Sequence, residues 1–162
     1  MAYRLQSLLR IRTTREDRAA ADLSVARQAV AEAQREVSNR EAELWEYKRT
    51  AEARRDRIYA AILGRPITRD ELDRAQEGVA RIDDEGRLRA DNVVLAKRQL
   101  SERQAAETVA HKAFAEASKE RMKITEHRTR WQMDEAREQE RLQEIELEDF
   151  TGKKSNDDNP RS

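Results

Sequence analysis

The stretch "AAILGRPITRDELDRA", residues 60–75, separates two long segments rich in alanine, glutamate and arginine. Gly64 suits the left-handed residue that ends a helix, and Pro66 cannot continue the preceding ladder of hydrogen bonds. Thr68 and Glu71 have the spacing of a capping box, in which each side chain accepts a hydrogen bond from the other residue's backbone N–H. The stretch therefore predicts the end of one helix, a turn and the start of a second helix.

Both flanking segments repeat apolar residues every seven positions. The first segment has the series Leu9, Leu23, Val30, Val37, Leu44, Ala51 and Ile58, with Glu16 as its one charged member, and a second series of Ala19, Ala26, Ala33, Tyr47 and Ala61. The second segment has Leu72, Ala75, Val79, Ile82, Gly86, Val93, Ala96, Leu100, Ala110, Phe114, Ala117, Ile124 and Trp131. A seven-residue repeat sustained over many turns is typical of a coiled-coil seam.

Two long helices joined by so short a turn lie antiparallel. We therefore predict an all-α fold over residues 1–150, a long antiparallel two-helix coiled-coil hairpin with the C-terminal helix overhanging. The helices should span about 3–62 and about 68–150, with the turn at 63–67. Residues 151–162 have no apolar period and are expected to form a disordered tail.

In such a hairpin, residue i faces roughly residue 131 minus i. The helix beyond Trp131 then has no partner within the chain. Gly86 falls opposite Leu44, Trp45 and Tyr47, where a missing side chain makes room for a bulky one. The rule also pairs seam charges, Arg54 with Glu77 and Arg27 with Glu107. It brings Arg10 and Arg12 level with Lys119 and Arg121, which predicts fraying at the open end or a partner there.

The composition excludes several classes of protein. Charged residues make up 41% of the chain and aromatic residues 4%. A chain of this length and composition has too few large apolar side chains to fill a globular core. Because 33 basic residues balance 33 acidic ones, no global field attracts nucleic acid or anionic lipid. The chain has no cysteine, no long apolar run and no signal peptide. We expect a cytoplasmic protein without direct membrane insertion and without nucleic-acid binding.

No motif for catalysis or cofactor binding is present. The chain lacks a phosphate-binding loop and a zinc-binding HExxH motif, and His111 and His127 lack metal-ligand spacing. Trp45, Tyr47 and Tyr59 have no basic groove beside them and are interpreted as packing residues. We therefore predict no catalytic residue, no cofactor and no metal.

The first turns of the chain carry the most informative surface. Tyr3, Leu5, Leu8, Leu9 and Ile11 spread around more than one face and alternate with arginines. A single partner helix covers only one of those faces. Two interpretations stay open, a frayed end that its arginines keep in solution and a docking surface for another protein.

Four segments carry a resemblance to a known family: "LLRIRTTREDRAAADLSVAR", "LWEYK", "AAILGRPITRDELD" and "RLQEIELEDF". Together they resemble the central-stalk proteins of bacterial type III secretion systems, the YscO family, which is related to FliJ of the flagellar export apparatus. The resemblance spans nearly all of residues 1–150. It implies a monomeric, non-enzymatic stalk, similar to the coiled coil of the gamma subunit of ATP synthase. Such a stalk inserts its terminal end into a hexameric ATPase and turns its tip toward a membrane-embedded export gate.

The resemblance also implies where these partners bind and where the protein is found. The ATPase-facing residues would be Tyr3, Arg4, Leu5, Leu8, Ile11, Arg12, Arg15, Arg128, Trp131, Leu142 and Ile145, and the gate-facing residues Arg65, Ile67, Glu71, Leu72 and Val79. The protein would lie at the cytoplasmic face of the inner-membrane secretion apparatus and also handle secretion chaperones. Two alternatives remain, a passive coiled-coil scaffold or dimerising tether, and an adaptor or chaperone for secreted proteins.

Overall fold

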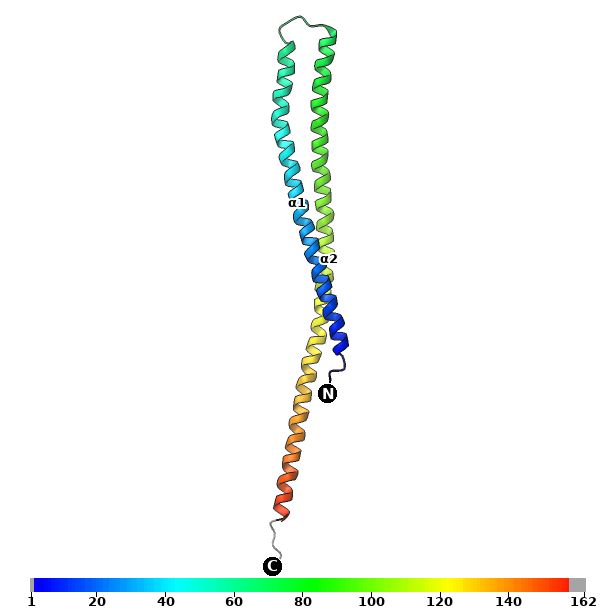
Figure 1. Cartoon of the computed structure of the whole chain (residues 1–162), viewed down its shortest axis with the longest axis vertical. Helices are drawn as coiled ribbons and strands as arrows, with labels where there is room; N and C mark the ends of the chain where they lie inside the picture. Colours follow the sequence, from blue (N-terminus) through cyan, green and yellow to red (C-terminus); the bar gives the residue numbers. More distant parts are fainter. Residues whose placement is uncertain (1, 158–162) are drawn as a thin grey trace, which may run out of the picture. The chain divides into compact units, whose positions relative to one another are not determined.

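The chain folds into two helices and contains no strand within the described residues. The computed structural model describes residues 2–157, with side chains to residue 154. Helix α1 spans Gln6–Ile62 and helix α2 spans Arg69–Asp157 (Figure 1). Neither described helix contains a segment apolar enough to cross a membrane.

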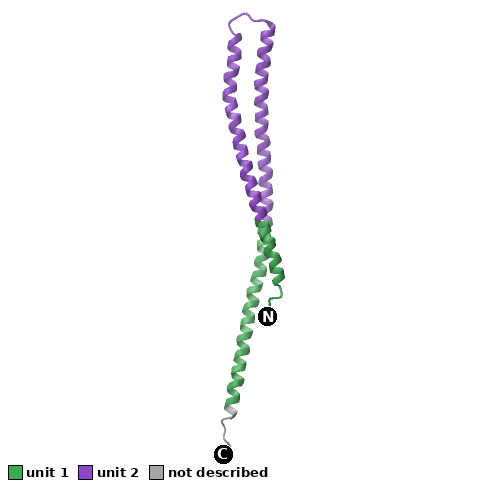
Figure 2. Cartoon of the chain, viewed as in Figure 1, with its two compact units in different colours: residues 1–20, 113–162 green, residues 21–112 purple. Residues whose placement is uncertain are grey.

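The structure divides into two compact units (Figure 2). Unit 1 comprises Met1–Ala20 and Ala113–Ser162, and unit 2 comprises Ala21–Lys112. In each unit, a segment of α1 contacts a segment of α2 that runs in the opposite direction. The predicted all-α, antiparallel two-helix hairpin is therefore confirmed.

The turn between the helices has the predicted chemistry. Gly64 has a φ of 76° and lies two residues after the end of α1. The Thr68 amide donates to the Glu71 carboxylate at 3.1 Å, and the Glu71 amide donates to the Thr68 hydroxyl at 3.2 Å. Both halves of the capping box are thus formed, and they fix the start of α2 at Arg69.

The heptad positions form the seam of unit 2. Ala51 and Ile82 are each only 2% exposed, and they form the core cluster together with Tyr47. Other buried members of the predicted series in this unit are Leu23, Val37, Ala75, Val93 and Ala96. Ala61 and Leu72 were also predicted to lie in the seam, but both are exposed. They belong to the helical turns next to the connection, where no further turn of helix covers them.

The register of the hairpin differs from the simple rule at some levels. Arg27 lies 3.8 Å from Glu107, as predicted. Arg54 pairs with Glu85 at 3.6 Å rather than with Glu77, eight positions earlier on α2. Eight positions are about 12 Å along a helix, more than the reach of an arginine side chain alone spans. The neighbouring pair of Arg55 and Asp83 is shifted in the same direction, so the facing positions on α2 lie later in the sequence here than the simple rule places them.

Gly86 makes room for the side chain of Tyr47 and not for that of Trp45. A Cβ atom at Gly86 would lie 3.3 Å from Cε1 of Tyr47, which confirms that contact. Trp45 is 63% exposed, and the Arg49 guanidinium lies over its ring at 5.4 Å. Tyr59 is also exposed, at 46%. The packing role predicted for Trp45 and Tyr59 is wrong, because each follows a seam residue and is turned about 100° away from it.

Helix α2 continues beyond the predicted end near residue 150 and reaches Asp157. The first seven residues of the expected tail are therefore helical. Gly152 disfavours a helix by only about 1 kcal/mol relative to alanine, and the sequence has no proline until position 160. Residues 158–162 lie outside the described residues, and the disorder of that segment stays a prediction.

Candidate interaction surfaces

Tyr3 closes the paired part of unit 1. Its ring lies 5.3 Å from the ring of Trp131 and 5.8 Å from that of His127, measured between centroids. The Tyr3 hydroxyl is hydrogen-bonded to Nδ1 of His127 at 2.7 Å, and Tyr3 is only 8% exposed. The segment before α1 is thus held against α2, and the predicted fraying is not observed.

Ion pairs across unit 1 remove the expected repulsion between its basic residues. Arg12 pairs with the carboxylate of Glu120 and also donates to the Glu120 carbonyl at 3.2 Å. Arg121 donates to Glu16 at 2.7 Å, which lowers the pKa of Glu16 below its ordinary value. The charge of Lys123 and then that of Arg12 lower the pKa of Glu120. Each arginine therefore meets an acid between the helices instead of another cation.

Arg128 retains an unsatisfied donor in the same unit. Its Nε atom is buried and has no hydrogen-bond acceptor among the described residues. Buried polar groups in proteins are normally hydrogen-bonded, because leaving one unpaired costs about 1 to 3 kcal/mol. Because the Nε atom itself is buried, an acceptor from another molecule could reach it only after the Arg128 side chain changes its conformation.

The residues that sequence reasoning assigned to the ATPase fall into three groups by accessibility. Tyr3 is buried in the contact with Trp131 and His127, so its ring holds the chain rather than presenting a surface. Half-buried members are Leu5, Leu8, Arg12, Arg128 and Trp131, and exposed members are Arg4, Ile11, Arg15, Leu142 and Ile145. The accessible members thus come from the first turns of α1 and the last part of α2.

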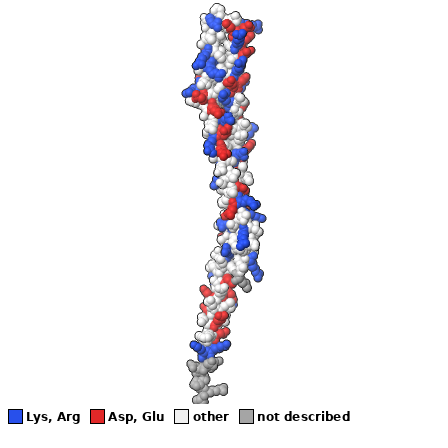
Figure 3. All heavy atoms as spheres, viewed as in Figure 1, with Lys and Arg blue, Asp and Glu red and all other residues white. Residues whose placement is uncertain are grey.

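We define the overhang as residues 132–154 of α2, beyond the contact between Tyr3 and Trp131. Leu142 is 50% exposed and Ile145 is 43% exposed. Between positions 132 and 150 the chain has eight acidic residues and two arginines, and acidic side chains gather along this part of α2 in Figure 3. The overhang is therefore an acidic helix with uncovered apolar side chains.

Leu147 and Phe150 belong to the same accessible apolar set and to the predicted region, but they were not among the residues named individually for the site. They are 64% and 63% exposed, and they line a shallow groove with Gln143 and Glu146. Both lie in the "RLQEIELEDF" segment. Their apolar character within an acidic helix was the signal that could have included them.

The tip of unit 2 contains the predicted gate-facing residues, but two of them stabilise the turn. Arg65 Nε donates to the Ala61 carbonyl at 2.8 Å, and its Nη1 lies 3.5 Å from Oε2 of Glu71. Ile67 and Val79 are half-buried, and Leu72 is 39% exposed. The most accessible apolar residue here is Leu63, 72% exposed, which sequence reasoning did not select.

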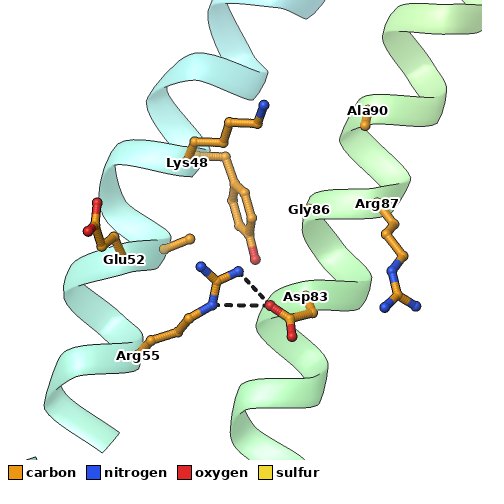
Figure 4. A pocket seen from close by; sticks show the side chains of 9 residues that line it. Lys48, Glu52, Arg55, Asp83, Gly86, Arg87 and Ala90 are labelled. Carbon is orange, nitrogen blue, oxygen red and sulfur yellow. Dashed lines mark hydrogen bonds and ion pairs between the residues drawn. The ribbon is translucent and has the colours of Figure 1, made fainter. Parts of the chain in front are cut away.

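A groove between the helices of unit 2 lies over small residues of the seam (Figure 4). Ala51, Gly86 and Ala90 line it together with charged side chains, of which Arg55 and Asp83 form an ion pair. Arg55 of α1 donates through Nε to Asp83 of α2 at 3.1 Å, as the dashed lines in Figure 4 mark. This ion pair joins the two helices across the groove. Among the described residues, no group of three His, Cys, Asp or Glu side chains could hold a metal ion.

The fold and the surfaces define a helical hairpin whose accessible apolar side chains suit protein–protein contacts. A family model described as "Type III secretion protein YscO" matches residues 5–153. The chain therefore belongs to the YscO family of type III secretion proteins, as its sequence motifs predicted. No curated protein and no solved structure matches the chain.

Proposed function

We propose that this type III secretion protein is the non-enzymatic central stalk of the export ATPase complex. Its unit 1 end enters a hexameric secretion ATPase and supports assembly of the hexamer and hydrolysis. The tip of unit 2 contacts the membrane protein of the export gate. The stalk acts as a monomer at the cytoplasmic face of the inner-membrane apparatus.

The uncovered seam of the overhang carries this proposal. Leu142 and Ile145 occupy the same heptad positions as Phe114 and Trp131, which α1 half-buries in the paired part of unit 1. Beyond Trp131 the seam continues without α1, and Leu142 and Ile145 remain exposed. A coiled-coil seam is stable in water when a facing helix fills its holes. Another protein that supplies this facing surface would bury the two side chains.

Two further features of unit 1 suit the same partner. Ile11, half exposed, lies on α1 among arginines that reach outward from the seam. The half-buried guanidinium of Arg128 lies close to the start of the overhang. A partner that brings apolar side chains and backbone or carboxylate oxygens would satisfy both features.

At the tip, the proposed gate contact uses the accessible apolar side chains. Leu63 and Leu72 are exposed, while Ile67 is half-buried between them in sequence. Arg65 and Glu71 hold the turn through their ion pair, so the loop presents these side chains from a defined backbone. A preorganised apolar loop loses less entropy on binding than a flexible one.

The first experiment measures ATP hydrolysis and hexamer formation by the cognate ATPase with the purified chain. The wild type should raise both, and the Leu142→Ala/Ile145→Ala variant should lose most of the increase because its seam cannot be filled. The matched control is Leu88→Ala/Leu95→Ala, which removes exposed leucines of unit 2, 60% and 51% exposed, and should behave as wild type. Absence of any stimulation by the wild type would reject the stalk function.

The second experiment tests the tip separately. Leu63→Ala/Leu72→Ala should reduce secretion in cells while leaving stimulation of the purified ATPase unchanged, because these residues lie in unit 2. Normal secretion by this variant would remove the gate contact from the proposal.

The exposed apolar side chains of the overhang also fit an adaptor that carries secreted proteins or their chaperones. That function predicts binding of a client protein by the purified chain in the absence of the ATPase. It also predicts that the Leu142→Ala/Ile145→Ala variant loses the client while ATPase stimulation persists.

A further inference from the structure

We propose that the overhang of one copy binds the outer face of α1 in a second copy, as an antiparallel helix pair. The outer stripe comprises Leu8, Ile11, Arg15 and Arg18 of α1, together with Arg4 in the turn just before α1 begins. The acidic stripe of the overhang comprises Glu135, Glu138, Leu142, Ile145 and Asp149. Within each stripe, successive members are three or four residues apart, so the helical members of each stripe share one face of their helix.

The two stripes are complementary when they run in opposite directions. Suppose that Leu142 of one copy faces Ile11 of the other. The next pair of facing residues toward the C-terminal end of α2 is then Ile145 and Leu8. In the other direction, Glu138 meets Arg15. The two outer levels bring Asp149 to Arg4 and Glu135 to Arg18. Two apolar pairs are thus flanked on both sides by pairs of opposite charge.

The alternation of steps supports this register. Along the overhang, Leu142 and Ile145 occupy the a and d positions of the continuing heptad. If the outer stripe is numbered as a heptad of its own, Leu8 takes an a position and Ile11 a d position. The proposed register therefore places Leu142 (a) opposite Ile11 (d) and Ile145 (d) opposite Leu8 (a). An antiparallel coiled coil packs a layers against d layers in this way. The parallel alignment would set Leu8 against Glu138 and Arg15 against Ile145, which pairs apolar with charged side chains. The antiparallel direction is therefore favoured.

Most of the side chains that would form the pair are exposed, while Leu8 and Glu135 are half-buried. Ile11 and Leu142 are each 50% exposed and Ile145 is 43% exposed. The side chains of Arg4, Arg15 and Arg18 form no ion pair within residues 2–154. Glu138 already pairs with Arg141 at 2.7 Å, but a carboxylate has acceptor capacity for a second donor.

Charge complementarity is the reason to choose a second copy as the occupant. Residues 2–20 contain five arginines and two acidic residues, whereas residues 132–150 contain eight acidic residues and two arginines. Both surfaces lie in unit 1, and one chain therefore carries both halves of the interface. Opposite fields of this kind favour encounter and fix the register of a complex.

The contact is heterologous, because it joins two different surfaces. Each copy offers one overhang and one outer stripe, so association either extends from copy to copy or closes into a ring. It would cover Ile11 and Leu142, which the proposed stalk function assigns to the ATPase. Self-association and ATPase binding would then exclude each other, yet self-association itself requires no ATPase.

The first test uses the purified chain alone. Light scattering and sedimentation velocity across the micromolar to millimolar range should show a mass that rises with concentration and falls with added salt. Arg4→Glu/Arg15→Glu and Glu138→Arg/Asp149→Arg should each weaken association by about tenfold or more, because attraction becomes repulsion at two levels. Mixing the two variants should restore association, because the exchanged charges again match.

The second test measures the register. The chain contains no cysteine, so introduced thiols are the only ones present. A short thiol crosslinker should join Ile11→Cys in one copy to Leu142→Cys in another. It should join Ile11→Cys poorly to Glu135→Cys, which lies one heptad, or roughly 10 Å, away. Circular dichroism of every variant should show wild-type helix content.

Three results would overturn the proposal. The first is a wild-type chain that stays monomeric over the whole concentration range. The second is a mixture of charge variants that does not associate although both are helical. The third is equal crosslinking at the matched and displaced positions. Because none of these measurements includes the ATPase, failure of the stalk function would leave their outcome unchanged.

Discussion

Replacing Ile82 with alanine tests whether the narrow seam holds unit 2 together. Ile82 is 2% exposed and packs with Tyr47, Ala51 and Ile58. The change removes three buried carbon atoms, worth about 0.8 kcal/mol each, and leaves a cavity. Alanine returns roughly 0.4 kcal/mol through its higher helix propensity. We expect the free energy of unfolding to fall by about 2 to 4 kcal/mol.

Urea unfolding followed by helix circular dichroism measures this loss. Leu95→Ala is the matched control, because Leu95 lies on the same helix and is 51% exposed. Its effect should stay within about 0.5 kcal/mol. If the two variants were equally stable, burial in the seam would not be what stabilises unit 2, and the reasoning from heptad positions to packing would be refuted.

Three further predictions concern the turn and one seam charge. Thr68→Ala should lower the free energy of unfolding by about 1 kcal/mol. Glu71→Ala should lower it less in the Thr68→Ala variant than in the wild type, because both side chains act through one capping box. Gly64→Ala should lower the free energy of unfolding by roughly 1 kcal/mol, because a φ of 76° is strained for alanine. No atom lies near an added Cβ, so the loss would come from the backbone alone. A urea midpoint that did not change would contradict the capping-box prediction or the Gly64 prediction, whichever variant showed it. The hydrogen bond from Arg121 lowers the pKa of Glu16 in the folded state, so its stabilising effect is present above the unfolded pKa and lost as pH falls through the lower, folded pKa. Glu16→Gln should therefore be less stable than wild type at neutral pH, and the difference in thermal midpoints should shrink below about pH 4; a constant difference would contradict this.

The fold could be predicted largely from local chemistry and periodicity. Gly64, Thr68 and Glu71 each act within a few residues, so their roles follow from spacing alone. The seven-residue repeat identified nearly every buried residue, because a seam position is set by its place in the heptad. The predicted contact of Gly86 with Tyr47 held for the same reason.

The errors arose where a side chain's direction or the local register departed from the simple rule. Trp45 and Tyr59 are level with the seam but point away from it, and Arg54 pairs with Glu85 where the facing positions lie later on α2 than the rule places them. At the open end, counting charges by level predicted repulsion between arginines. The structure instead pairs Arg12 with Glu120 and Arg121 with Glu16. In each pair an acidic residue thus takes the place of the opposing cation.

The candidate surfaces could be located by region but not ranked by residue. Tyr3 was assigned to docking because it belongs to the apolar residues of the first turns, where the family resemblance places the ATPase, whereas its ring is buried against α2. The residues named individually did not include Leu63, Leu147 and Phe150, which are among the most exposed apolar residues. The heptad pattern reports which face the second helix covers, but it does not report the level at which that cover ends.

The contact of Tyr3 with Trp131 explains why one heptad series serves two purposes. Before this contact, α1 covers the seam of α2 and stabilises the hairpin. After it, Leu142 and Ile145 occupy the same heptad positions but are exposed. Periodicity along α2 does not change at this point, so the repeat alone cannot distinguish a packing residue from a binding residue. What distinguishes them is the level at which α1 stops covering α2. The overhang is thus a half-filled seam, and whichever molecule supplies the missing face, an ATPase or a second copy, must match an acidic, apolar helix.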